Sequence, residues 1–101
     1  MAYELNDEEL ENVSGGLDEI EDYTLEYGAF YCQKTQALYQ NPVYLVQITY
    51  LSGNNVSYVK RRYWPGDRKI DWYGSGSFST SIWVFQEDFG KKVYVPDNVK
   101  R

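Results

Sequence analysis

The sequence predicts a mainly β protein, a small antiparallel barrel or sandwich that follows a short N-terminal helix. Three observations predict this fold class. Short segments with alternating apolar and polar residues recur after residue 23, and clusters of Gly, Asn, Pro and Ser separate them. Tyrosine, which favours strands, occurs 11 times among aromatic residues that make up 18% of the chain. The hydrophobic fraction of 43% is too high for an intrinsically disordered protein.

The first predicted element is a short acidic helix that ends at a glycine pair. Leu5, Leu10 and Val13 fall on one side of such a helix at about 3.6 residues per turn. Acidic residues fill its first turn, where the helix dipole favours negative charge. Gly15 and Gly16 end the helix, because glycine adopts left-handed and extended conformations without steric cost.

This N-terminal stretch resembles the double-glycine leader of bacteriocin and related peptide precursors of Gram-positive bacteria. That family carries a leucine, an acidic residue followed by leucine, an apolar and often β-branched residue, and Gly-Gly at fixed spacings. The resemblance implies that the peptidase domain of an ABC exporter grips the apolar helix face, cuts after the second glycine and exports the rest. The residues that match the family's pattern are Leu5, Glu9, Leu10, Val13, Gly15 and Gly16.

The resemblance divides the chain into a leader peptide, residues 1–16, and a cargo domain, residues 17–101, with Leu17 as its new N-terminus. Charge supports this boundary, because residues 1–16 contain five acidic residues and no Lys or Arg, which accounts for the whole net charge of −5. The cargo is neutral by count, which argues against a nucleic-acid partner. The alternative is an intracellular β protein in which Gly15-Gly16 is an incidental linker.

The cargo is predicted to consist of short strands. Residues 17–23 are acidic and fit either one more helical turn or a solvated arm, so we expect the ordered sheet to start after Tyr23. Residues 74–79, rich in Gly and Ser, are expected to form a hairpin tip. The strands predicted from alternation are residues 23–27, 29–33, 43–51, 56–64, 70–73, 80–87 and 92–95.

The clearest pair of strands is a hairpin formed by residues 43–51 and 56–64. Turn residues at 52–55 join the two strands. In the first strand, alternation places the apolar and aromatic even-numbered residues on one face and polar residues on the other. The alternation breaks at residues 60–62, which predicts a bulge or a strand that leaves the sheet.

From Trp64 onward the cargo also resembles a bacterial Src-homology-type barrel. Three segments follow the order of that family: Pro65-Gly66-Asp67 before a strand, Trp83-Val84-Phe85, and the run from Gly90 to Pro96. This resemblance implies that the cargo binds wall peptides or cell-wall glycans.

A basic and aromatic cluster is the candidate ligand site of the cargo. Lys60, Arg61 and Arg62 are consecutive, and Trp64 follows closely. Such a cluster suits an anionic cell-wall or membrane-surface ligand. The alternative is a solvated hairpin edge, kept charged to prevent edge-to-edge pairing. The aromatic residues near Trp72 and Trp83 fit either a ligand groove or the core of a small sheet.

The sequence offers little for catalysis. The chain has no histidine and a single cysteine, Cys32, so a cysteine nucleophile would lack its usual base and no intrachain disulfide can form. We therefore expect no catalytic residues, no metal and no cofactor, and interpret the chain as a substrate of a peptidase rather than an enzyme. No secretory signal peptide or membrane span is evident, so the double-glycine route is the expected path to secretion from a cytoplasmic precursor.

Two functions of different classes remain for the secreted cargo. One is a bacteriocin-like antimicrobial or signalling protein that acts on neighbouring cells. The other is a binding module for wall or surface ligands. Membrane-active bacteriocins are typically cationic or glycine-rich, and this neutral, tyrosine-rich cargo departs from that pattern.

Overall fold

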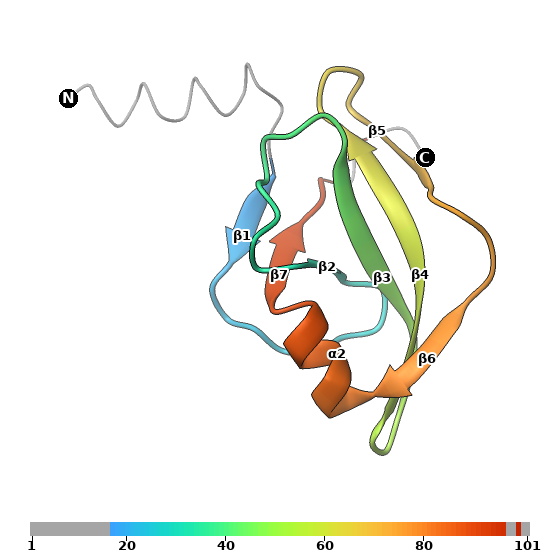
Figure 1. The fold of residues 1–101 in the computed structure, drawn as a ribbon. Coiled ribbons are helices and arrows are strands. Elements are labelled where there is room, and N and C mark those ends of the chain that lie inside the picture. Colours follow the sequence, from blue (N-terminus) through green and yellow to red (C-terminus); the bar gives the residue numbers. More distant parts are fainter. Residues whose placement is uncertain (1–16, 97–98, 100–101) are drawn as a thin grey trace.

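The computed structural model describes residues 17–96 and 99, which form one antiparallel sheet with a short helix packed on it (Figure 1). The helix, α2, spans Ile82–Asp88. The predicted leader residues 1–16 lie outside the described part of the chain. The strands are β1 (Asp18–Ile20), β2 (Phe30–Cys32), β3 (Val43–Ser52), β4 (Asn55–Trp64), β5 (Lys69–Trp72), β6 (Phe78–Ser81) and β7 (Lys91–Tyr94).

Six strands follow the order β1-β7-β2-β3-β4-β5. The seventh, β6, pairs with the first part of β4, residues 55–58, whereas β5 pairs with the last part, residues 61–64. This arrangement confirms the predicted mainly β fold class and the β3–β4 hairpin, which is the longest pairing in the sheet. The predicted closure into a barrel or sandwich is not shown, because the strands form a single open sheet.

The strand predicted at residues 80–87 is wrong for most of its length. Only Thr80 and Ser81 belong to a strand, and α2 begins directly after them. Ser81 caps the helix, because its side-chain oxygen accepts a hydrogen bond from the Val84 amide at 3.2 Å. Ile82, Phe85 and Phe89 recur at helical spacing and turn towards the sheet. In so short an apolar segment, alternation does not separate helix from strand.

Three further boundaries differ from the prediction. The sheet starts at Asp18 rather than after Tyr23, because β1 pairs with β7 along its whole length. Residues 23–27 form no strand, and instead cross the sheet as a loop held by hydrogen bonds from tyrosine side chains. The segment 74–79 is not a hairpin tip, because it leads into β6, which pairs with the same strand as β5.

The predicted bulge lies in the other strand of the hairpin. Residues 60–62 of β4 keep a regular register with β3, whereas the register shifts between Ile48 and Tyr50 of β3. The expected polar face of β3 is also wrong, because Val43 and Leu45 are as deeply buried as Val46 and Ile48 on the other face. Both faces of β3 therefore carry buried side chains.

Each face of the sheet has its own hydrophobic core. Consecutive residues of a strand point to opposite faces, so Leu45 and Val46 belong to different cores. The Phe85 core, which α2 covers, consists of Tyr31, Val46, Ile48, Val56 and Phe85. The Ile70 core on the other face consists of Leu17, Phe30, Cys32, Val43, Leu45, Tyr63, Ile70, Val93, Val95 and Val99.

Candidate functional site

The predicted cut point borders directly on the fold. The predicted recognition residues Leu5, Glu9, Leu10 and Val13, and the glycines Gly15 and Gly16, lie outside the described residues. Leu17, the residue expected to follow the cut, is only 6% exposed and belongs to the Ile70 core. Its amide donates to the carbonyl oxygen of Leu38 at 3.0 Å. The first residue of the predicted cargo is therefore part of its core.

The predicted basic patch on β4 is divided between the two faces of the sheet. Arg61 points to the face of the Ile70 core and is 7% exposed. Its guanidinium lies 4.3 Å from the centroid of the Trp72 ring, and it donates hydrogen bonds to the Gln47 side chain and to the Asp71 carbonyl oxygen. The structure does not bring Arg61 together with Lys60 and Arg62.

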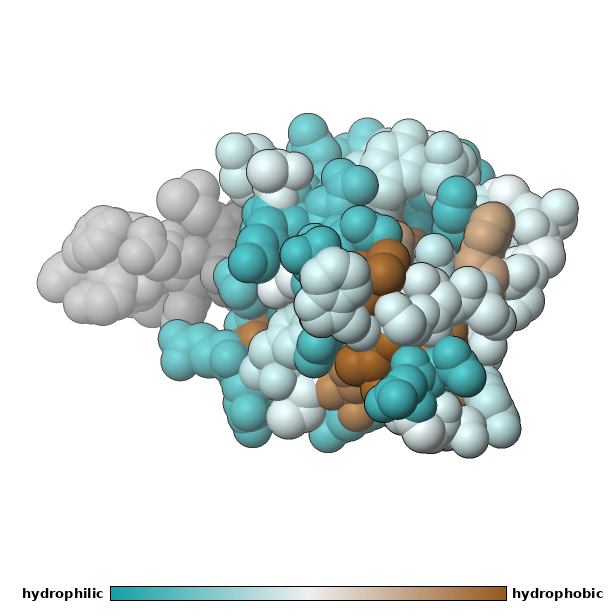
Figure 2. All heavy atoms as spheres, turned by 60° about the horizontal axis from the view of Figure 1, so that its bottom comes forward, coloured by the Kyte–Doolittle hydropathy of each residue, from teal (hydrophilic) through white to brown (hydrophobic). Residues whose placement is uncertain are grey.

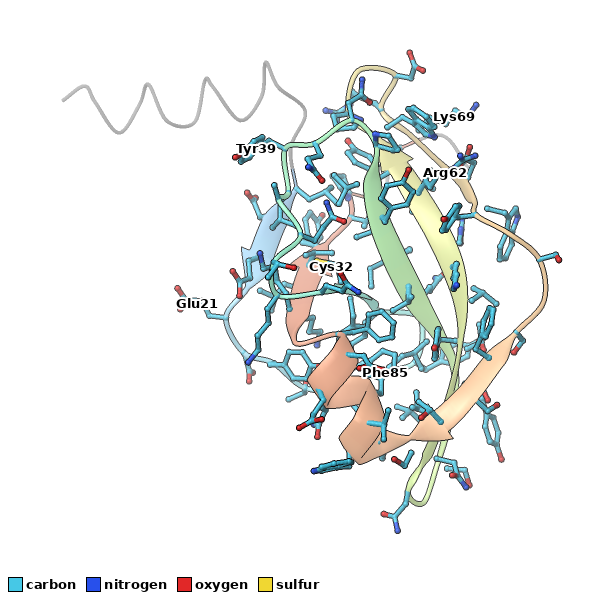
Figure 3. All side chains as sticks on the ribbon, viewed as in Figure 1. Glu21, Cys32, Tyr39, Arg62, Lys69 and Phe85 are labelled. Atoms are coloured by element: carbon cyan, nitrogen blue, oxygen red, sulfur yellow. The ribbon has the colours of Figure 1, made fainter. Side chains whose placement is uncertain are left out.

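Arg62 and Trp64 are engaged by one carboxylate. Arg62, labelled in Figure 3, lies on β4. It donates to both oxygens of Asp71, from Nε to Oδ1 at 3.2 Å and from Nη2 to Oδ2 at 3.1 Å. The Trp64 indole also donates to Oδ2 at 3.2 Å. Partial desolvation acts to raise the pKa of Asp71, but these hydrogen bonds and the charge of Arg62 outweigh it and lower that pKa. Arg62 and Trp64 thus form an internal cluster with Asp71.

Two members of the predicted patch line cavities: Arg61 lines the second cavity described below, and Lys60 lines a groove. This groove has a volume of about 330 Å³, and we call it the Tyr44–Tyr73 groove. It lies on the sheet face of the Phe85 core, between β3, β4 and the segment after β2. The residues that line it are Gln33, Gln36, Tyr44, Leu45, Val46, Lys60, Tyr73 and Phe89.

Two tyrosines give this groove its character. The rings of Tyr44 and Tyr73 have centroids 5.0 Å apart and planes inclined at 57°. Both side chains stay open to solvent, at 44% and 43% exposure. The pairing of β4 with β5 continues beyond Trp72, because the Tyr73 amide donates to the Lys60 carbonyl oxygen at 3.0 Å. The sheet itself therefore sets the position of Tyr73.

Aromatic rings hold Lys60 in place. Its Nζ lies 4.7 Å from the centroid of Phe78 and 5.9 Å from that of Tyr73. Among residues 17–96 and 99, no carboxylate lies within ion-pair distance of this ammonium group. Lys60 thus presents a positive charge at an aromatic groove.

The sequence identifies Lys60 and leaves Tyr73 open between a ligand groove and the core, but it does not connect Tyr44, Gln33 or Gln36 with either residue. The available signal was alternation, which puts Tyr44, Lys60 and Arg62 on a common face once the hairpin register is known. Gln33 and Gln36 reach the groove from the irregular segment after β2, for which the sequence has no periodic signal.

A second cavity of about 510 Å³ lies around β2 and β7 and includes a buried lysine. Lys92 is only 4% exposed, and its Nζ forms an ion pair with Glu26 at 3.0 Å and donates to Thr24 Oγ1 at 3.0 Å. The charge of Lys92 is therefore already compensated within the fold, as buried charges generally require.

Cys32 has a structural environment. It is 1% exposed, and burial raises its thiol pKa to about 11, so the thiolate that a nucleophile requires is disfavoured. Within the described ranges, no group of three or more His, Cys, Asp or Glu side chains is placed to hold a metal ion. No helix in this part of the chain has the length and apolar character that a membrane span needs.

Comparisons with protein-family models, with curated proteins and with solved structures found no match for this chain.

Proposed function

We propose that this chain is the precursor of a small exported protein, cut after Gly16 by the peptidase domain of an ABC exporter. The observation that carries this proposal is the spacing of Leu5, Glu9, Leu10 and Val13 before the glycine pair. The placement of β1 immediately after that pair supports it, since the strands pair with one another within the range expected for the cargo. In this role the chain is a substrate, and it is secreted from a cytoplasmic precursor.

For the exported domain we favour a binding module for wall or surface ligands. The specific observation is the Tyr44–Tyr73 groove, which combines exposed rings, amides and one cation, as small-ligand sites commonly do. The neutral charge of residues 17–101 fits this role better than membrane disruption. A Src-homology-like barrel stays a prediction, and the binding role does not depend on it.

A cleavage assay with the cognate leader peptidase tests the precursor role. We expect one cut, after Gly16, and no cut in Gly16→Val, because a side chain would clash in a cleft that accepts glycine. Leu10→Ala should lower the specificity constant by about ten- to a hundredfold, since a buried leucine contributes roughly 1–3 kcal/mol to binding. Glu11→Ala is the matched control on the polar side of the predicted helix. Equal rates for the two alanine variants, or a cut elsewhere, would contradict the leader.

Because Leu17 is buried and hydrogen-bonded, we also expect the folded domain to restrict its own cleavage. A peptidase that binds an extended chain must release residues on both sides of the cut, which here requires opening β1. The cross-strand pair Asp18 and Tyr94 allows a direct test, because both side chains are exposed. Asp18→Cys combined with Tyr94→Cys should lock β1 to β7 when the two thiols are oxidised.

We expect the locked form to be cut at least about tenfold more slowly than the same protein after reduction, since the lock prevents local opening. The two single-cysteine variants are the controls for effects of the substitutions. The native Cys32 should not interfere, because it is buried with a raised pKa. Equal rates for the oxidised and reduced forms would show that the peptidase cuts without release of β1.

The two roles of the exported domain are separated by two assays on the same preparation. A binding module should be retained by purified cell walls and leave the growth of related strains unchanged. A bacteriocin-like or signalling protein should inhibit or alter growth at low concentration without wall retention. The second outcome would overturn the binding role and leave the precursor role standing.

A further inference from the structure

We propose that the Tyr44–Tyr73 groove binds an acidic saccharide, a sugar ring that stacks on the two tyrosines and places a carboxylate or phosphate at Lys60. This inference rests on the binding role proposed above and assigns the ligand class. It is independent of whether the leader is cut.

The ring pair fits the face of a sugar. Aromatic faces carry partial negative charge, and the C–H groups on one side of a sugar ring carry partial positive charge, so the two surfaces attract each other. Tyr44 and Tyr73 offer such faces with centroids 5.0 Å apart, and both rings are more than two-fifths exposed. The groove volume of about 330 Å³ is at the small end of ligand sites, which suits one or two sugar rings.

The charge of the groove selects an acidic ligand. Two other basic side chains near this part of the sheet have partners: Arg62 pairs with Asp71, and Lys91 donates to the Gln36 backbone carbonyl oxygen at 3.0 Å. Lys60 differs, since only aromatic rings lie close to its ammonium group within the described part of the chain. A single anion on the ligand would complete this site with a charge-assisted hydrogen bond.

Amide groups at the rim suit the hydroxyls of a sugar. The Gln36 side chain is oriented by hydrogen bonds from its amide nitrogen to Ala37 O and to the Gln40 side chain. The side-chain nitrogen donors of Gln36 are thereby used, and its side-chain oxygen Oε1 can accept a hydrogen bond from a ligand hydroxyl. Gln33, which is exposed, adds a further donor and acceptor beside it.

The test is a titration of the full chain followed by amide chemical shifts. Three probes are compared: a hexuronic-acid disaccharide, a hexose phosphate, and a neutral hexose disaccharide. We expect both acidic probes to shift residues of the groove and to bind about tenfold more tightly than the neutral one, because only they engage Lys60 with a charge. The two acidic arms distinguish a carboxylate-bearing ligand from a phosphate-bearing one.

Variants assign the contacts. Lys60→Met should lower the affinity for the acidic probes about tenfold, to the affinity of the neutral probe. Tyr73→Ala should weaken all probes, because it removes half of the stacking surface. The matched controls are Lys69→Met and Tyr50→Ala, an exposed lysine and an exposed tyrosine outside the groove, and both should bind as the unchanged protein does.

Several results would overturn the proposal. These are equal affinity for the neutral and acidic probes, unchanged binding by Lys60→Met, or shifts confined to residues outside the groove. If no saccharide binds but purified walls still retain the protein, the ligand class is wrong and the binding role stands. If the walls do not retain the protein either, the binding role fails as well.

Discussion

One face of the sheet carries two groups of aromatic rings with similar spacing and opposite fates. At the α2 end, Tyr31 and Phe85 are fully buried, with ring centroids 5.3 Å apart. At the other end, Tyr44 and Tyr73 approach to 5.0 Å and stay more than two-fifths exposed. Contact between rings therefore does not distinguish a core from a surface. The difference is the covering element, since α2 places Phe85 over Tyr31, whereas none of the described helices or strands lies over Tyr44 and Tyr73.

Phe89 connects the two groups. Its ring lies 5.1 Å from that of Phe85, and its side chain also lines the Tyr44–Tyr73 groove. The Tyr23 hydroxyl donates to the Phe89 carbonyl oxygen at 2.6 Å and fixes the end of α2. Apolar side chains gather around α2 and the β3–β4 hairpin on the face shown in Figure 2. The groove therefore begins where the covered core ends.

The largest expected effect on stability comes from a substitution in the buried ring pair, Tyr31 and Phe85. Phe85→Ala should lower the free energy of unfolding by about 3–5 kcal/mol, because it leaves a cavity between α2 and the sheet. Chemical denaturation of the full chain measures this. Trp83→Ala is the matched control, since Trp83 lies on the same helix with 66% exposure and should change stability by less than about 0.5 kcal/mol. Similar losses in both variants would show that α2 does not bury Phe85 as described.

A smaller effect is expected from alkaline pH. Burial raises the pKa of Tyr31 to about 12, with a further Coulombic effect of Glu26, although the hydrogen bond from the Glu26 amide opposes the rise. The pKa of Tyr23 is also raised to about 12, by burial and by the neighbouring Tyr31. Below the ordinary tyrosine pKa of 10.0, these hydroxyls are protonated in both the folded and the unfolded chain, so their titration does not change stability. Between pH 10 and 12 the unfolded chain loses the proton first, so stability falls.

We expect Tyr31 alone to account for a loss on the order of 2–3 kcal/mol as the pH rises through its folded-state pKa. Denaturation at a series of pH values from 7 to above 11 measures the slope. Tyr31→Phe should remove this part of the slope. A stability that does not change over this range would contradict the burial of the Tyr31 hydroxyl, which donates to Thr24 O at 2.7 Å.

The sequence predicted the parts of this fold that local chemistry determines. The β3–β4 hairpin follows from alternation and from the turn residues between its strands. The helix α2 was missed because its seven residues are too few for the two periodicities to differ clearly. The strand β1 was missed because its partner β7 is distant in the chain, and three residues, two of them acidic, carry no strand signal of their own.

The candidate site shows the same limit. Lys60, Arg61 and Arg62 form one patch in the sequence, but strand alternation sends Arg61 to the opposite face. The partner of Arg62, Asp71, comes from β5, and sequence analysis had no means of pairing them before the register was known. Lys60 is the part of the prediction that remains as a candidate ligand contact. The exposure of the tyrosines beside Lys60 depends on the absence of an element that would cover them, and no local sequence pattern indicates such an absence.

The smallest expected effect on stability is at the open end, and it sharpens the comparison most. Tyr73→Ala should change the free energy of unfolding by no more than about 0.5 kcal/mol, because Tyr73 is exposed and leaves no closed cavity. The same substitution should weaken the binding of all three saccharide probes, whereas Trp83→Ala should leave that binding unchanged. Denaturation and titration of both variants measure the two quantities together. A large loss of stability in Tyr73→Ala would mean that its ring supports the sheet as Phe85 does, and the open rings would then be structural rather than a ligand surface.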